Sequence, residues 1–378
     1  MKKYLILALI LAACGHPIPC PPLCPPPPTP APTPPAATPT ATAPAPTPTP
    51  RPAASPPPLQ GRLVSVRGWD RYSGPGQRPR LGADSGGGLR IAWTTKPAGG
   101  RMQATLEDGS GRVLEQHLVQ VSGPAEYFPS LPVGGRLLYR SGAELRWGDD
   151  LAGAGEWEAY AGYASGDRVG IVAWQPCAAG AGCPASAIWR DGGVWRASPW
   201  ARELFGVALA PAGAGRVAMA SRENPANSGL TLRTLDEQAL LRGEIVELGA
   251  AQSWRPPRGL SLEDPTLVLG ASRPVALAEA FDLQTKRSSG RVFLAELGAQ
   301  LREVLQAWPS DGNVEVAGAE LGGVLYLADE LAEGRSALWR WQGSGLVLLG
   351  DVPGEAPSLG LAEGSLWMSS TRGLWRLE

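Results

Sequence analysis

The pattern of apolar and polar positions changes abruptly near residue 59. From there to residue 378, short apolar runs alternate with Gly, Pro, Asp and Ser; clear examples are the segments 63–66, 89–93, 136–139, 170–174 and 324–327. Runs of this length, rich in β-branched and aromatic residues and bounded by turn formers, are typical of β-strands. Helical periodicity is nearly absent. The pattern predicts one short helix within 236–242, capped by Asp236 and ended by Gly243, in an otherwise all-β domain.

The apolar runs belong to a repeat. An aliphatic-Trp-Arg motif occurs four times, as Ile188-Trp189-Arg190, Val194-Trp195-Arg196, Leu338-Trp339-Arg340 and Leu374-Trp375-Arg376. Weaker copies of the surrounding two-strand unit start near residues 89, 136, 170, 216, 274 and 323. Units of about 40–50 residues, each with three or four short strands, are the signature of a β-propeller.

The length of this region favours seven blades. Seven units of about 45 residues need about 315 residues, and the segment 59–378 is of that size. Six and eight blades are the alternatives, and tandem β-sandwich domains with units near 100 residues are the alternative fold. The last unit lacks an outer strand, which the isolated segment 62–67 can supply. Such pairing would leave no open edge in the ring.

The first 58 residues have a different character. An apolar run at 4–13 follows Lys2 and Lys3; it is too short to span a bilayer and is typical of a secretory signal. Directly after Leu-Ala-Ala comes Cys14, an arrangement that resembles the lipobox of bacterial lipoproteins. The resemblance implies that 1–13 is a lipoprotein signal peptide and that Cys14 carries lipid. Several acyl chains would hold the protein at a membrane. An ordinary secreted protein is the alternative.

The segment 14–58 is composed mainly of Pro, Ala and Thr. Proline fixes φ and removes a hydrogen-bond donor, so we expect a disordered, extended stalk that separates the lipid from a propeller at 59–378. At ~3.1 Å per residue it would reach on the order of 100 Å. The expected location is the cell envelope, extracytoplasmic and lipid-anchored; the membrane leaflet is left open.

Cysteine usage agrees with an oxidising compartment. Cys177 and Cys183 flank a loop of small residues, so we predict a disulfide between them. The states of Cys20 and Cys24 in the stalk are left open. Together with His16 they provide too few ligands for a closed zinc site, so no metal is predicted.

The composition offers little catalytic chemistry. A formal net charge of −1 gives no basic field for nucleic acid. His117 is the single histidine of the folded region, which disfavours a Ser-His-Asp triad. No phosphate-binding or dinucleotide-binding glycine motif occurs. We therefore predict no catalytic residue and no cofactor, and an enzyme is disfavoured without being excluded.

Fourteen tryptophans are the most informative side chains. Seven that fall in predicted strands are expected to pack between blades: Trp93, Trp147, Trp174, Trp189, Trp339, Trp367 and Trp375. Four nearer predicted loops are the expected ligand contacts: Trp157, Trp200, Trp254 and Trp308. The long loops expected to form interaction surfaces are 175–186, 222–228 and 282–290.

These features together predict a membrane-anchored extracytoplasmic lipoprotein. Its propeller is expected to be a non-catalytic binding or scaffold module for an envelope protein or glycan. The alternative is an envelope enzyme of propeller form, either carbohydrate-active or quinone-dependent. The identity of the ligand and the oligomeric state are left open.

Overall fold

The computed structural model describes residues 61–69, 78–121, 129–155, 157–175, 185–200, 202, 204, 206–222, 229–306, 315–331, 334–342 and 345–378. The chain divides into two units, 1–57 and 58–378, and the described residues all belong to the second. The predicted signal peptide 1–13, the stalk 14–58 and the lipidation site Cys14 lie outside the described residues.

The described residues form six antiparallel-rich sheets, five with four strands and one with eight. The eight-stranded sheet consists of two four-stranded units, which are joined by the parallel pairs Val268–Gly318 and Leu269–Ala319. The described part of the chain therefore forms seven four-stranded units. It differs from seven separate blades because two of the units are hydrogen-bonded to each other.

Each unit is a meander whose strands can be grouped by position. The first strands are β2 (Arg80–Ala83), β6 (Leu131–Val133), β10 (Ala159–Ser165), β14 (Gly206–Pro211), β18 (Leu260–Leu269), β22 (Val316–Leu321) and β26 (Ser358–Ala362). The second strands are β3 (Leu89–Thr94), β7 (Arg136–Ser141), β11 (Arg168–Trp174), β15 (Arg216–Arg222), β19 (Val275–Asp282), β23 (Val324–Leu331) and β27 (Ser365–Ser370).

The outer half of each unit follows the same order. The third strands are β4 (Arg101–Asp108), β8 (Glu144–Trp147), β12 (Ala185–Asp191), β16 (Leu230–Asp236), β20 (Arg287–Glu296), β24 (Arg335–Gln342) and β28 (Gly373–Leu377). The fourth strands are β5 (Val113–Gln120), β9 (Asp150–Ala154), β13 (Val194–Trp200), β17 (Gln252–Trp254), β21 (Arg302–Gln306), β25 (Gly345–Pro353) and, from the start of the domain, β1 (Leu63–Gly68).

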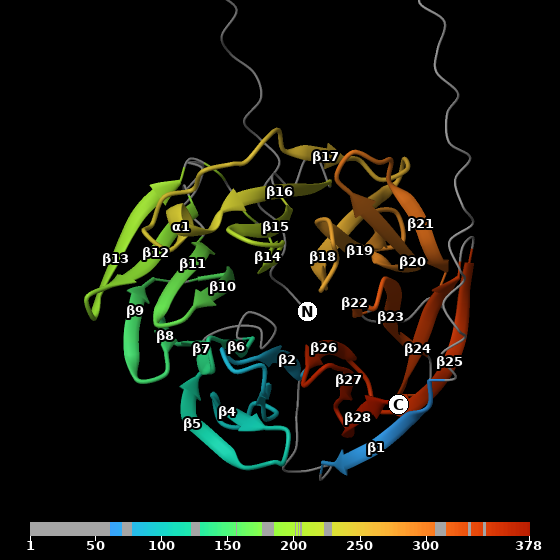
Figure 1. Cartoon of the computed structure of the whole chain (residues 1–378), viewed down its shortest axis with the longest axis horizontal. Coiled ribbons are helices and arrows are strands. Elements are labelled where there is room, and N and C mark those ends of the chain that lie inside the picture. The colour runs from blue at the N-terminus through green and yellow to red at the C-terminus, as the bar shows by residue number, and fades with distance from the viewer. Residues whose placement is uncertain are drawn as a thin grey trace, which may run out of the picture. The chain divides into compact units, whose positions relative to one another are not determined.

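The units are arranged in a closed ring. Each first strand contacts the first strand of the next unit, from β2 through β6, β10, β14, β18 and β22 to β26, which in turn contacts β2. In Figure 1 the first strands lie around the centre of the ring and the fourth strands lie at its circumference. The predicted β-propeller is confirmed, and the alternative of tandem β-sandwich domains is wrong.

The first strand of the domain closes the ring. β1 pairs antiparallel with β28, with Leu63 opposite Leu377. The backbone nitrogen of Arg62 donates to the oxygen of Glu378 at 3.0 Å, and the reverse bond measures 3.1 Å. The predicted pairing of segment 62–67 with the last unit is therefore confirmed.

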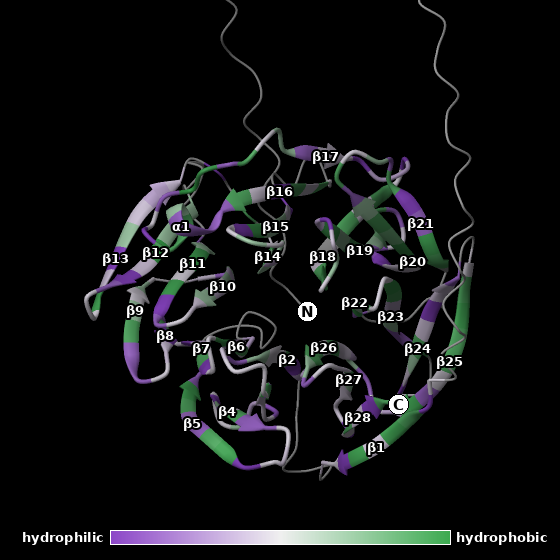
Figure 2. Cartoon of the chain, in the orientation of Figure 1, coloured by the Kyte–Doolittle hydropathy of each residue, from purple (hydrophilic) through white to green (hydrophobic). Residues whose placement is uncertain are grey.

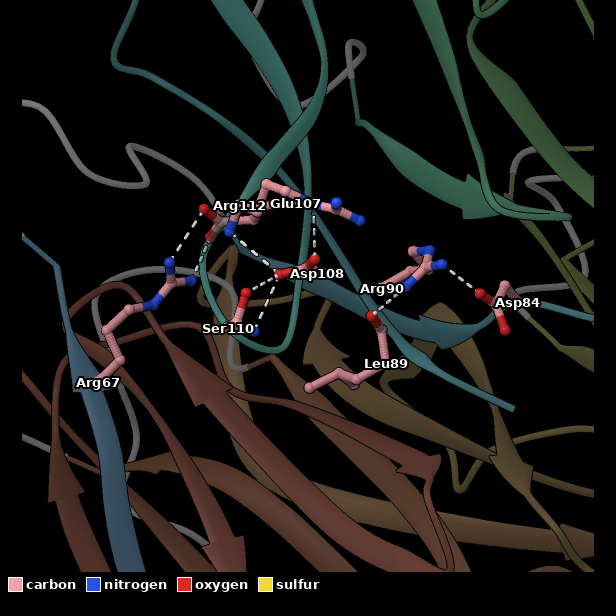
Figure 3. Close-up of polar contacts among 8 residues, drawn as sticks. All are labelled: Arg67, Asp84, Leu89, Arg90, Glu107, Asp108, Ser110 and Arg112. Carbon is pink, nitrogen blue, oxygen red and sulfur yellow. Dashed lines mark hydrogen bonds and ion pairs between the residues drawn. The ribbon is translucent and has the colours of Figure 1, made fainter. Parts of the chain in front are cut away.

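A buried carboxylate ties this closing strand to the first unit. Glu107, in β4, is bound by both terminal nitrogens of Arg67, with Nη1 at 3.1 Å, and by the indole Nε1 of Trp69 at 3.2 Å. Figure 3 shows Arg67 reaching from β1 to this carboxylate. A charge-assisted, two-pronged arginine–carboxylate bond is strong and geometrically specific. The last and first units are thus joined by side chains as well as by backbone.

The second strands are the most buried of the fold. In β3 and β27, for example, nearly every residue is buried. A strand that has neighbours at both edges and sheets on both faces reads as a continuous apolar run. This is why the predicted segments 89–93, 136–139, 170–174 and 324–327 all fall on second strands.

The fourth strands have one face toward solvent. Exposed aliphatic side chains occur on β5, where Leu118 is 65 % exposed, and on β25, where Leu348 is 50 % exposed. Figure 2 shows hydrophobic stretches on β1, β5 and β25 at the circumference. These strands mix apolar and polar residues on both faces, so their sequence pattern is weak.

The predicted helix is present but short. α1 (Glu237–Leu240) is capped by Asp236, whose Oδ1 accepts from the backbone nitrogen of Ala239 at 2.7 Å. Gly243 follows with φ +80°, a conformation that favours glycine. Among the described residues, no helix has the length and apolar character needed to cross a bilayer.

Candidate ligand-binding site

Two of the four tryptophans expected to contact a ligand are core residues. Trp157 is 4 % exposed and packs against Gly153 and Ile188. Trp254 is 7 % exposed, and its Nε1 donates to the backbone oxygen of Ala299 at 3.0 Å. Neither indole offers a surface to a ligand, which argues against the contact role predicted for them.

The other two have different positions. Trp200 ends β13 and is half-buried, with the guanidinium carbon of Arg233 5.6 Å from its ring centroid. Its role as a ligand contact stays a prediction. Trp308 lies outside the described residues, as do Cys177 and Cys183, so the predicted disulfide is untested.

The three predicted loops also differ. Most of 175–186 and of 222–228 lies outside the described residues. The segment 282–290 is a tight turn between β19 and β20, in which Asp282 accepts from the backbone nitrogens of Gln284 at 2.8 Å and Thr285 at 2.9 Å. The prediction of a long loop there is wrong, because β20 begins at Arg287.

Most of the strand tryptophans pack as predicted. Five are buried: Trp93, Trp147, Trp174, Trp367 and Trp375. Trp339 is half-buried and uses its Nε1 to donate to Asp329 at 2.8 Å. Trp189 is the exception, since its half-exposed ring lines a pocket.

This pocket has a volume of about 670 Å³ and is formed by three segments of two adjacent units. The segments are the turn from β10 to β11, the end of β12 with its turn into β13, and the residues that follow α1. In Figure 1, α1 lies beside β12. The lining residues are Asp167, Arg168, Trp189, Arg190, Asp191, Gly192, Gly193, Arg196, Leu241 and Arg242.

Glycine holds the tryptophan in place. A Cβ on Gly243 would lie 1.9 Å from Cε3 of Trp189, so the indole packs directly against the glycine backbone. The hydroxyl of Ser198, on β13, donates to the oxygen of Gly243 at 2.6 Å. Any other residue at 243 would displace the ring, and its positive φ would be strained as well. We call the pocket lined by these ten residues the Trp189 pocket. Its wall is formed by α1 and the residues that follow it, up to Gly243.

Two further hydrogen bonds fix α1 to the neighbouring unit. The hydroxyl of Tyr163 donates to Oε1 of Glu237 at 2.9 Å, and Nη1 of Arg168 donates to Oε1 of Gln238 at 3.1 Å. Burial, followed by the hydrogen bond to Glu237, raises the pKa of Tyr163, so it remains a donor. The wall of the pocket is therefore preformed.

Two of the pocket's four arginines already have acidic partners. Nη2 of Arg190 lies 3.1 Å from Oδ2 of Asp150, and its guanidinium carbon lies 5.5 Å from the ring centroid of Trp147. Nε of Arg196 lies 3.6 Å from Oδ2 of Asp191. These two positive charges are partly neutralised within the protein.

The other two arginines have no acidic partner among the described residues. Arg168 donates to the neutral amide of Gln238. The exposed guanidinium of Arg242 has neither a hydrogen bond nor an ion pair in the described part of the chain. Asp167, also exposed, supplies a carboxylate beside them. The pocket thus combines an apolar ring, two guanidinium groups without an acidic partner in the described residues, and carboxylate acceptors.

A second cavity is smaller and is lined by fewer polar side chains. Its volume is about 250 Å³, and it lies at the turn from β26 to β27, beside Gly87 and Leu321. Glu363 is its single charged lining residue. It offers no set of converging polar side chains, so the Trp189 pocket is the better candidate.

Two carboxyl groups have raised pKa values, but they do not form a pair. Burial raises the pKa of Asp329 to about 6 and, with repulsion from Glu355, Glu315 and Asp329, that of Glu330 to about 7. Asp329 is bound by Trp339, whereas Glu330 accepts from the backbone nitrogen of Ala356 at 3.2 Å. Neighbours along a strand point to opposite faces. They therefore do not face each other across one cleft, as the two acids of a glycosidase do.

The described residues hold no metal-binding set. His117 lies on β5, stacked on Tyr139 with ring centroids 4.8 Å apart, and its Nε2 is 3.5 Å from Glu115. Within the described ranges, no group of three or more His, Cys, Asp or Glu side chains is placed to hold a metal ion.

The turns that bear aspartate use it for local structure. Asp84 accepts from the backbone nitrogens of Gly86 and Gly88, and Asp108 accepts from Ser110 and Arg112. Figure 3 shows the contacts of Asp84 with Arg90 and of Asp108 with Ser110. The hydroxyl of Ser110 is the main cause that lowers the pKa of Asp108. These carboxylates stabilise turns and are not free for a ligand.

Comparisons with known proteins give distant structural similarity. No protein-family model matches the chain, and no curated protein matches its sequence. The Aleuria aurantia lectin, described as a six-bladed β-propeller with a novel fucose recognition mode, matches at 11 % identity and a TM-score of 0.43 over 73 % of this chain and 96 % of that one. The SapL1 lectin in complex with α-methyl fucoside matches at 12 % identity and a TM-score of 0.43 over 79 % of this chain and 88 % of that one.

Proposed function

We propose that the protein is a membrane-anchored, extracytoplasmic binding module whose propeller takes a glycan of the cell envelope at the Trp189 pocket, without catalysis. The observation that carries the proposal is the half-exposed indole of Trp189, fixed against Gly243 among hydrogen-bond donors and acceptors. A sugar ring has apolar C–H faces and a rim of hydroxyl groups. A rigid aromatic face surrounded by polar groups complements both.

The preformed wall supports binding rather than turnover. Hydrogen bonds from Tyr163 and Arg168 hold α1, so a ligand meets a site that needs little rearrangement. Preorganisation raises affinity because fewer groups must be ordered on binding. In the described residues no cluster of side chains is placed to hold a metal ion, and the two carboxyl groups with raised pKa values, Asp329 and Glu330, lie outside the pocket.

The membrane anchor is supported by the sequence of residues 1–14. The apolar run after Lys2 and Lys3, followed by Cys14, has the order of a lipoprotein signal. A lipid on Cys14 and the proline-rich stalk would display the propeller away from the membrane surface. Replacement of the cysteine, Cys14→Ser, should abolish labelling with radioactive palmitate and release the protein from membranes. Palmitate labelling that survives in this variant would contradict the anchor.

Binding can be tested with the full chain purified in detergent micelles. A panel of neutral and acidic envelope oligosaccharides would be screened, and the best binder measured by isothermal titration calorimetry. Trp189→Ala should weaken that binder at least tenfold, with no cleavage product in the wild-type reaction. The matched control is Trp341→Ala, because Trp341 is also half-buried and lies near an arginine, Arg302, but in another unit. Equal binding by wild type and Trp189→Ala, or no bound saccharide at all, would contradict the proposal.

A further inference from the structure

Two arginines of the pocket have no acidic partner among the described residues, which points to a charged ligand. Resting on the function proposed above, we infer that the saccharide taken by the Trp189 pocket is acidic, with a carboxylate bound by Arg168 and Arg242. These two guanidinium groups lie on opposite sides of the boundary between two units, one at the start of β11 and the other after α1. Both line the pocket.

The four arginines of the pocket differ in how far acidic side chains already neutralise them. Asp150 and Asp191 partly neutralise Arg190 and Arg196. Arg168 keeps its full charge because its partner is the neutral amide of Gln238. Arg242 also keeps its charge, since its guanidinium has no partner in the described part of the chain. A planar guanidinium binds a carboxylate through two parallel N–H···O bonds.

The aspartates of the same pocket restrict the ligand further. Asp167 and Asp191 present carboxylate oxygens, which accept hydrogen bonds. They suit the hydroxyl groups of a sugar and repel additional negative charge. A monosaccharide unit with one carboxylate and several hydroxyls, a uronic acid, satisfies both requirements. A densely charged sulfated or phosphorylated chain satisfies only the arginines.

Trp189 then contributes affinity for sugars in general, whereas the two arginines contribute selectivity for the acid. The indole of Trp189 binds any sugar of suitable shape, charged or neutral, because dispersion and apolar contact do not depend on charge. Arg168 and Arg242 distinguish an acid from its neutral derivative. Loss of the ring therefore weakens all ligands, whereas loss of an arginine removes the preference for the acid.

The test compares acids with their own methyl esters, which keep the shape and remove the charge. Calorimetry with the full chain in micelles would use trigalacturonate, a hyaluronan tetrasaccharide, their methyl esters and a sulfated galactan trisaccharide. We expect at least one uronate to bind ten or more times tighter than its ester. Arg242→Gln and Arg168→Gln should each reduce that ratio to about threefold or less, and Trp189→Ala should weaken acid and ester equally. The control is Arg101→Gln, an exposed arginine of β4 in another unit.

The guanidinium of Arg242 has no hydrogen bond or ion pair in the described residues, so Arg242→Gln should keep the wild-type melting temperature, and a reduced ratio in that variant reports recognition. Equal affinity for acid and ester, an equal effect of Arg101→Gln, or preference for the sulfated trisaccharide would overturn the inference. Binding of neutral oligosaccharides alone would overturn it while leaving the proposed function intact. Failure of every saccharide to bind would overturn both.

Discussion

Two copies of the aliphatic-Trp-Arg motif lie in different environments in this propeller: one tryptophan is buried and the other is half-exposed. Leu374-Trp375-Arg376 lies on β28 and Ile188-Trp189-Arg190 on β12, both third strands of their units. Trp375 is buried beneath the closing strand, with Ser65 of β1 opposite it. Trp189 pairs across the sheet with Arg196 and is left half-exposed beside a pocket.

The two tryptophans differ in burial because different segments pack against them, whereas the motif itself is the same. At the closure, β1 and Glu107 fill the space around the strand, and the arginine of β1 is neutralised by a buried carboxylate. At the pocket, β13 pairs with β12 as β1 pairs with β28, but the indole packs on Gly243 after α1, and Arg242 is left without a carboxylate partner in the described residues. The same aromatic residue is therefore part of the core in one unit and lines a pocket in another.

The largest effect should come from removing the closing strand. Deletion of residues 62–67 removes the pairing of β1 with β28 and the Arg67–Glu107 bond, which exposes a sheet edge and the core beneath it. We expect the melting temperature to fall by at least about 5 °C. Deletion of six residues within 25–58 is the control. Equal melting temperatures in calorimetry would contradict closure by β1.

The motif comparison predicts a reversal between stability and binding. Trp375→Ala should reduce the free energy of unfolding by about 3–5 kcal/mol, since it removes a buried indole. Trp189→Ala should reduce it by about 1–2 kcal/mol, because the ring is half-exposed. Denaturant titration would measure both. Similar losses of stability in the two variants would remove the distinction between the two copies of the motif.

The next largest effect on the free energy of unfolding should come from Glu107, the carboxylate at the ring closure. Glu107→Gln leaves the guanidinium of Arg67 opposite a neutral amide and weakens three hydrogen bonds. The expected loss of unfolding free energy is about 3 kcal/mol. The matched variant at the pocket, Arg242→Gln, should change stability by less than about 0.5 kcal/mol, since that side chain has no partner in the described residues. A loss as large in the second variant would show that its arginine is structural.

A smaller, pH-dependent effect is expected at Asp329, far along the ring from the pocket. Burial raises its pKa to about 6, from an ordinary value of 3.8. As pH rises from about 4 to 6 the unfolded chain loses its proton first, so ionisation destabilises the folded state, and the loss stays constant above pH 6. Asp329→Asn cannot ionise, so it should be more stable than wild type by roughly 2 kcal/mol at pH 8 and equal to it near pH 4. Denaturant titrations at both pH values would test this, and a gain that persists at pH 4 would contradict burial of the charge as its cause.

The sequence predicted the strands that are covered on both faces. Second strands such as β11 are apolar throughout, so their runs are visible without any structure. The first strand β6 has three residues, and fourth strands such as β5 carry apolar residues at exposed as well as at buried positions, which weakens their signal. The joining of two units depends on Val268 meeting Gly318, a contact between distant residues that no local pattern contains.

The site was predictable only in part. The sequence indicated α1, its Asp236 cap and Gly243, and it marked Trp189-Arg190 as part of a repeat. The pocket itself depends on the contact between Gly243 and the indole of Trp189. These two residues are distant in the chain, so no local sequence pattern predicts their contact. The single helix in an all-β repeat was the signal that one unit departs from the others. Proximity to a loop misled the assignment of Trp157, because the neighbouring unit covers it.

One measurement tests the central claim directly. The full chain, labelled with 5-fluorotryptophan, would be titrated with the best-binding uronate oligomer and followed by ¹⁹F NMR. The resonance that is absent from Trp189→Phe should shift on titration, while the resonance absent from Trp375→Phe stays in place. A stationary Trp189 signal, with shifts confined to Trp157, Trp200, Trp254 or Trp308, would contradict the Trp189 pocket as the binding site.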